Sequence, residues 1–142
     1  MPASTATSAS RRDRSENIRR LAEVATHLAR NGHIAIVAAV SPSREDRAAA
    51  RQIADTAFRE IYVATPAEIC ESRDPKGHYA KARTGALPAF TGIGNDYQPP
   101  LHSELIIDTS TSSVSEAAGA IEHMLVTTGV LFEEVIDLAA NI

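Results

Sequence analysis

The sequence predicts an α/β fold built on a parallel sheet, and three observations support that prediction. Segments with helical periodicity alternate with short apolar runs along the chain, the order typical of α/β domains. The run over residues 34–40 is apolar on both faces, as in a strand covered by helices on each side. A length of 142 residues fits one domain and leaves no room for a second full core.

Composition limits the classes of partner. The formal net charge of −4 gives no support for a nucleic-acid or membrane-surface partner. The apolar runs are too short to span a membrane, and residues 1–10 have no apolar segment of a secretory signal. The one cysteine, Cys70, makes neither an internal disulfide nor a metal site. We therefore expect a cytoplasmic protein without a bound structural metal.

The first half of the chain predicts two helices that flank the apolar run. Residues 1–12 read as a disordered tail. A helix is predicted over 14–30, with Asp13 and Glu16 as a capping box and Gly32 just past its end. Its apolar positions recur every three or four residues: Ile18, Leu21, Ala22, Ala25, Leu28 and Ala29. After the strand, Pro42 suits the first position of a second helix that runs to about Phe58.

The second half predicts two more strands and several helices. Strands are predicted over 61–65 and 105–107, and Pro66 opens a short helix after the first of them. Residues 73–100 carry glycines, prolines and charges with little periodicity, which predicts a long functional loop with one or two helical turns. Two further helices are predicted at the end: 113–127, and a short one over 130–139.

A cluster of charges over residues 13–20 lies at the start of the first predicted helix. Arginine forks bind phosphate or sulfate in a bidentate way, and helix N-termini attract anions. A solvated helix face with intrahelical ion pairs explains the same residues, and on charge alone it is the favoured interpretation. The cluster by itself therefore leaves anion binding open.

Ser41 follows the apolar run directly, at the end of the predicted strand. Ligands of open α/β sheets bind at the carboxyl ends of strands, so Val40 and Ser41 are candidate ligand contacts. Capping of the next helix is the plainer role for Ser41, and without further context it is favoured.

The loop after residue 72 is rich in cations and contains an aromatic. Its composition is that of a lid that closes on a polyanion. Phe90, beside a glycine, offers a face for stacking, although phenylalanine is more often a core residue. The four cations are Arg73, Lys76, Lys81 and Arg83.

Taken together and in order, these segments resemble the adenylylsulfate kinases. The matching segments are 13–20, Ser41-Pro42, 73–85 and 90–93, and the resemblance runs from about residue 11 to about residue 128. It implies a three-layer P-loop kinase fold and transfer of the ATP γ-phosphoryl group to the 3′-hydroxyl of adenylylsulfate, with Mg²⁺. It divides the chain into a tail (1–12), a partial kinase domain (13–128) and a C-terminal helical extension (129–142).

The resemblance also implies a role for each matching residue. Those that bind adenylylsulfate are Arg14, Asn17, Val40, Ser41, Lys76 and Phe90, with Phe90 stacking on the adenine. The resemblance assigns Arg73, Lys81 and Arg83 to the lid and to the side of the site that binds the nucleotide. Ser41 occupies the family's phosphoserine position, but direct in-line transfer needs only positioning and charge stabilisation. A substrate hydrogen bond from Ser41 is therefore the simpler assignment.

One feature of the family is missing from the sequence. No G-x-x-x-x-G-K-[ST] motif occurs, so nothing cradles the ATP phosphates or holds Mg²⁺ as the P-loop does. We expect an incomplete sheet that lacks the P-loop strand and the strand after it. The unpaired edge of 34–40 should then make the chain unstable alone. A truncated gene, a misplaced start codon or a split kinase would each explain the sequence.

Three functional readings remain open at this point. The chain is a kinase whose missing half comes from another chain, a non-catalytic module that binds sulfonucleotides or pairs with an intact kinase, or a non-functional fragment. For the 142 residues alone we expect no catalysis, and we expect either a homo-oligomer or a complex with an intact kinase chain.

Overall fold

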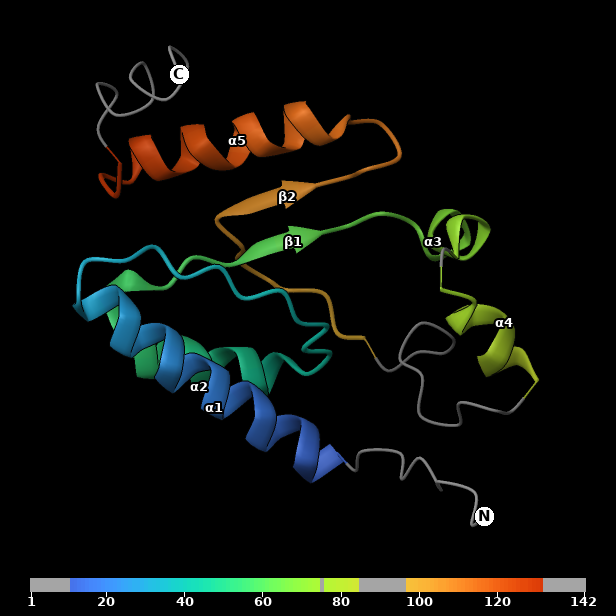
Figure 1. Ribbon diagram of the computed structural model, residues 1–142, viewed down its shortest axis with the longest axis horizontal. Helices are drawn as coiled ribbons and strands as arrows, with labels where there is room; N and C mark the ends of the chain where they lie inside the picture. The colour runs from blue at the N-terminus through green and yellow to red at the C-terminus, as the bar shows by residue number, and fades with distance from the viewer. Residues whose placement is uncertain (1–10, 75, 85–96, 132–142) are drawn as a thin grey trace.

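The computed structural model describes residues 11–74, 76–84 and 97–131, and Figure 1 shows their arrangement. The helices are α1 (Arg11–Arg30), α2 (Arg44–Ala54), α3 (Ala67–Arg73), α4 (His78–Arg83) and α5 (Val114–Thr127), with a 3-10 turn at Asp55–Ala57. The strands are β1 (Ile61–Val63) and β2 (Leu105–Ile107). The α/β prediction is confirmed.

The two strands form a small parallel sheet. Ile61 pairs with Leu105 and Val63 with Ile107, and the Ala64 amide continues the ladder to the Ile107 carbonyl at 2.7 Å. In Figure 1, α5 lies along β2, whereas α1 and α2 pack against each other on the other side of the strands. Parallel strands joined through helices are the unit that the sequence pattern predicts.

Helix α1 begins earlier than predicted. Arg11 and Arg12 belong to the helix rather than to a tail, because arginine is a good helix former and nothing there stops the helix. Asp13 therefore lies inside the first turn, and the predicted capping box is wrong: Glu16 pairs with arginines further along α1. The helix ends as predicted, at Gly32 (φ 82°).

The apolar run over 34–40 forms no strand in the structure, so this prediction is wrong. Its large side chains are exposed, Ile36 by 89% and Val40 by 62%. A strand needs backbone partners on its edges and cover for its faces. Within the described residues, the sheet contains only β1 and β2, which leaves this segment extended along α1 and α2 without a ladder.

The remaining elements follow the sequence closely. Helix α2 begins at Arg44, so the prediction of Pro42 as its first residue is wrong: Ser43, a favoured N-cap type, takes the N-cap position. The helix also ends earlier than predicted, at Ala54, and a 3-10 turn leads on to Phe58. The described part of the long segment after residue 73 contains one short helix, α4, in line with the one or two helical turns expected. Helix α5 has a complete capping box between Ser113 and Glu116. The predicted helix over 130–139 falls largely outside the described residues.

Candidate functional site

The described segments that carry predicted site residues lie toward one side of the molecule. Figure 1 shows both strands pointing the same way, toward helices α3 and α4 and the N-terminal ends of α1 and α2. This is the carboxyl side of the sheet, where ligands of open α/β folds bind. The fold therefore places the candidate segments where a ligand site is expected.

Ser41 lies in a strained turn between the exposed apolar run and α2. Its φ of 33° falls in the left-handed region, which is uncommon for a residue other than glycine. Such a conformation costs about 1–3 kcal/mol and persists only where neighbouring contacts hold it. The Ser41 carbonyl accepts a hydrogen bond from Arg47 Nη1 at 2.5 Å, which supplies one such contact.

Arg47 is the most deeply buried charged residue of this region, with 8% of its surface exposed. Its Nη2 donates to the Gln98 carbonyl at 2.5 Å. Its Nε lies 2.7 Å from Glu60 Oε1, as an ion pair without the alignment of a hydrogen bond. Its guanidinium also lies over the ring of Tyr97, 5.4 Å from the centroid. These contacts replace the water that the buried cation has lost.

The segment from Tyr97 to Pro100 is fastened to the start of α2. The Gln98 amide donates to the Pro42 carbonyl at 2.9 Å, and the Gln98 side chain accepts from the Arg44 amide at 2.9 Å. Arg44 Nε donates to the Pro99 carbonyl at 2.6 Å. Burial raises the pKa of the Tyr97 hydroxyl. The chain after residue 96 is thus joined directly to the Ser41 turn.

A second arginine of α2 closes the cluster toward the sheet. Arg51 makes a bidentate contact with Glu104 at 2.7 and 2.9 Å and lies over the ring of Phe58. The Glu60 amide donates to the same carboxylate at 2.6 Å. Burial opposes ionisation of Glu104, but hydrogen bonds from Arg51 and from backbone amides outweigh it and lower its pKa. This part of the cluster fastens α2 to the starts of β1 and β2.

The lid candidates divide into two groups. Arg73 donates to the hydroxyl and the carbonyl of Thr109, both at 2.8 Å, and Arg83 forms a two-pronged ion pair with Glu71. Both arginines therefore hold the fold together in this structure. Lys76 and Lys81, in contrast, are exposed.

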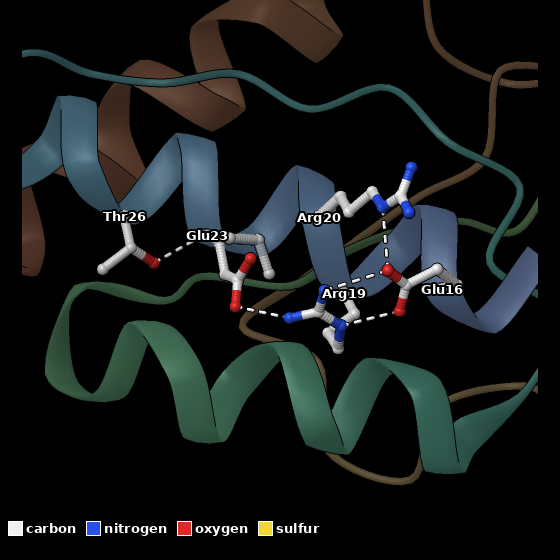
Figure 2. A network of polar contacts seen from close by, with 6 residues as sticks. Glu16, Arg19, Arg20, Glu23 and Thr26 are labelled. Atoms are coloured by element: carbon white, nitrogen blue, oxygen red, sulfur yellow. Dashed lines mark hydrogen bonds and ion pairs between the residues drawn. The ribbon is translucent and has the colours of Figure 1, made fainter.

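The charged start of α1 forms a network along the helix surface. Figure 2 shows Glu16 between Arg19 and Arg20, and Arg19 reaching on to Glu23 at 2.5 Å. Hydrogen bonds from Arg19 and Arg20 lower the pKa of Glu16 to about 2. The favoured interpretation of this cluster, a helix face with intrahelical ion pairs, is thus confirmed. Of the two predicted substrate residues here, Arg14 is half-buried and Asn17 is exposed.

An open groove of about 700 Å³ runs between α1 and α2. Its lining mixes both signs of charge, and neither Arg14 nor Asn17 belongs to it. The lining residues are Arg11, Arg12, Ser15, Glu16, Arg19, Arg20, Glu45, Asp46 and Ala49. Because the lining has four arginines against three carboxylates, the groove has little excess charge to attract an anion.

Sequence reasoning found the outer residues of the region and missed those that hold it together. The sequence predicts no buried, structural role for Arg47, Glu60 or Gln98, since an arginine within an amphipathic helix is expected to face solvent. The contact between Arg47 and Gln98 joins residues 51 positions apart, which no local pattern reveals. Phe90, the predicted stacking residue, lies outside the described residues.

The residues present do not fit a complete Mg²⁺·ATP site. The sequence has no Walker A motif, and the described ranges contain no group of three or more histidine, cysteine or acidic side chains placed to hold a metal. P-loop kinases use that loop for the phosphates and for the metal. No helix of the described part is long and apolar enough to cross a membrane.

Comparison with known proteins gives one consistent result. The family model for adenylylsulphate kinase matches residues 4–108. The probable adenylyl-sulfate kinase of Halalkalibacterium halodurans is 50% identical over 113 residues, or 79% of this chain and 56% of that protein. The adenylyl-sulfate kinase of Paraburkholderia xenovorans is 42% identical over 117 residues, or 82% of this chain and 65% of that protein.

A solved structure agrees with the sequence relatives. The APS kinase CysC of Mycobacterium tuberculosis, solved in complex with AMPPNP and APS, superposes with a TM-score of 0.78 at 45% identity. The match covers 82% of this chain and 68% of that one. The chain thus spans between about half and two thirds of the length of the curated relatives it matches most strongly.

Proposed function

This chain belongs to the adenylylsulphate kinase family, and on that premise we propose that residues 13–128 carry the adenylylsulfate-binding part of such a kinase. The observation that supports this most strongly is that the described parts of the matching segments, the Ser41 turn among them, lie toward the carboxyl side of the sheet. The family reaction is the ATP-dependent phosphorylation of the 3′-hydroxyl of adenylylsulfate, a step of sulfate assimilation, and we place it in the cytoplasm.

In this proposal each site residue has a physical role. Arg14 and Asn17 bind the anionic and polar parts of the substrate from the start of α1. Val40 and Ser41 contact it from the turn, with the Ser41 hydroxyl as a hydrogen-bond donor. Lys76 supplies a mobile positive charge, since its exposed side chain has the freedom to move toward a bound polyanion. Phe90 stacks on the adenine ring.

The residues that would bind ATP form a less complete set than those proposed to bind adenylylsulfate. Arg73 and Arg83 would have to leave Thr109 and Glu71 to face a nucleotide, whereas exposed Lys81 would not. Without the Walker A lysine and hydroxyl, these 142 residues have no group to neutralise the transferred phosphoryl. We therefore propose that catalysis requires a phosphate loop from outside this sequence.

A second candidate is a non-catalytic module that pairs with another kinase chain. The exposed apolar run over 34–40 favours it, because Ile36 and Val40 are 89% and 62% exposed among the described residues. An unpaired extended segment is a ready template for association with another strand.

A turnover assay tests the catalytic part of the proposal. Purified 142-residue protein, given Mg²⁺, ATP and adenylylsulfate, should form no detectable 3′-phosphorylated product. Loss of such preorganised charge stabilisation costs several orders of magnitude in rate. Product formation at a rate near that of an intact family member would refute the requirement for an external phosphate loop.

A further inference from the structure

The burial of Arg47 is unusual, because an arginine on a surface helix normally keeps its charged end in water. Helix α2 presents Arg44, Arg47 and Arg51 on the side that meets the rest of the domain, and of these only Arg47 is almost fully buried. Taking a guanidinium out of water is costly unless its charge and its donors are matched. Arg47 meets that cost with one carboxylate, two backbone carbonyls and one aromatic ring.

The two carbonyls belong to segments that are far apart in sequence. One is that of Ser41, in the strained turn before α2, and the other is that of Gln98, on the chain that returns toward β2. A guanidinium is a rigid planar fork, so binding both carbonyls at 2.5 Å fixes one segment relative to the other. Glu60 holds the base of the fork from the strand side, 2.7 Å away.

The turn at Ser41 depends on this fork more than on its own sequence. A serine at φ 33° is not intrinsically stable, and the N-cap at Ser43 makes no side-chain capping bond that would fix the start of α2. The hydrogen bond from Arg47 acts on the Ser41 carbonyl directly, whereas Gln98 holds the neighbouring Pro42 and Arg44. Loss of the fork should therefore change where the Ser41 backbone and hydroxyl lie.

We propose that Arg47 is a positioning residue of the adenylylsulfate site: it holds the Ser41 turn in its strained conformation and fastens it to the Gln98 segment. Arg47 acts through Ser41 and need not touch the substrate. This inference rests on the proposed function, since it assigns Arg47 to the same site. Tyr97, whose ring centroid lies 5.8 Å from that of Tyr62, stacks on Tyr62 and lies against the guanidinium.

The test compares three variants of the full chain. Arg47→Lys keeps the charge beside Glu60 but replaces the fork by a point charge, which cannot serve both carbonyls and the carboxylate at once. Arg47→Met combined with Glu60→Gln removes both charges, so no ion is left buried without a partner. Arg51→Lys is the matched control, because Arg51 lies on the same helix and contacts Glu104 instead of the turn.

The first readout is amide hydrogen exchange, which needs no ligand. The Gln98 amide, bonded to the Pro42 carbonyl, should exchange about tenfold faster in both Arg47 variants. The Ala64 amide, bonded within the sheet, should exchange as in the unmodified chain. Equal acceleration of both amides would mean that Arg47 only stabilises the fold, and would overturn the inference.

The second readout is adenylylsulfate affinity, measured by calorimetry on the same proteins. Both Arg47 variants should bind about tenfold more weakly, whereas Arg51→Lys should bind normally. Adding Ser41→Ala to Arg47→Lys should weaken adenylylsulfate binding little more than either change alone. Both changes act on the same contact, that of the Ser41 hydroxyl with the substrate. Additive losses, or unchanged affinity in Arg47→Lys, would overturn the inference. No binding by the unmodified chain would contradict the proposed function itself and remove any substrate-directed role for Arg47, while the exchange data would still show whether Arg47 joins the two segments.

Discussion

Glu16 accepts hydrogen bonds from two arginines on one face of α1, with distances of 2.7 Å to the Nε atoms of both Arg19 and Arg20. These contacts lower the pKa of its carboxyl from 4.5 to about 2. A carboxyl whose pKa is lower in the folded protein stabilises the fold above its unfolded pKa, and that contribution disappears as pH falls through the folded value. The relevant window is therefore from about pH 4.5 down to about pH 2.

Glu16→Gln should accordingly lower the thermal stability of the protein at pH 7 but not at pH 2. The effect should be modest and should shrink in high salt, since the Glu16 side chain is 39% exposed and exposed pairs are screened. Thermal unfolding followed by circular dichroism at both pH values measures it. Glu122→Gln, an exposed change on α5, is the control. A difference that persists unchanged at pH 2 would show that the ion pairs are not its cause.

Single residues also show where sequence reasoning stops. The Arg-rich start of α1 could be interpreted correctly as ion pairs because its partners lie three or four positions away. Arg47 could not, because its partners Ser41, Glu60 and Gln98 meet only after the chain has folded. Long-range burial of a cation leaves no trace in local periodicity.

At the scale of elements, helix ends were predicted well wherever the signal is local. Gly32 and Gly129 both follow a helix with positive φ, 82° and 70°, and both end it with the paired backbone bonds of a Schellman motif. Ser113 and Glu116 supply the capping box of α5. The start of α1 was misplaced, because arginines extend a helix beyond an apparent cap.

Two glycines, Gly119 within α5 and Gly129 just after its end, should respond to alanine in opposite directions. Gly119 lies inside the helix with open space around its Cα, so Gly119→Ala should raise the free energy of unfolding by about 0.5–1 kcal/mol. Gly129 has a left-handed φ of 70°, so Gly129→Ala should lower it by about 1 kcal/mol. Urea unfolding of both variants measures the pair. The same sign for both would mean that α5 does not end at Gly129 in solution.

Strands were predictable only where their partners are present in the chain. Residues 61–63 and 105–107 became β1 and β2, because each finds the other in register. Residues 34–40 have stronger strand composition yet form none, because composition reports burial and cannot supply a neighbouring strand. The strand predicted over 34–40 is therefore absent because it lacks a neighbouring strand to pair with, although its residues favour strand structure.

At the scale of the whole molecule, the described residues leave many large apolar side chains exposed to solvent. Few of its described hydrophobic side chains are buried, among them Ala22, Ile107 and Met124, while Ile36, Val40 and others are open. A continuous exposed apolar stretch marks an interaction surface or an aggregation liability. The fold class was predictable at this scale, but a complete core is not formed by the described residues.

We expect the 142-residue chain to self-associate or to require a partner. Light scattering over a concentration series should show a mass above that of the 15.1 kDa chain, with a thermal transition that rises with protein concentration. Replacing Ile36 by Lys should reduce the association, because it places a charge in the exposed run. A monomer with a cooperative, concentration-independent transition would contradict this expectation.

We propose that this chain binds the sulfonucleotide, whereas its sequence lacks the loop that binds ATP phosphates. Calorimetric titration of the purified chain with adenylylsulfate, and separately with a non-hydrolysable ATP analogue, tests it most directly. Phe90→Ala serves as the site control, since loss of a stacking aromatic costs about 1–3 kcal/mol of binding. We predict saturable adenylylsulfate binding that Phe90→Ala weakens by that amount, and much weaker binding of the ATP analogue. Absence of adenylylsulfate binding, or tight binding of the ATP analogue alone, would contradict the claim.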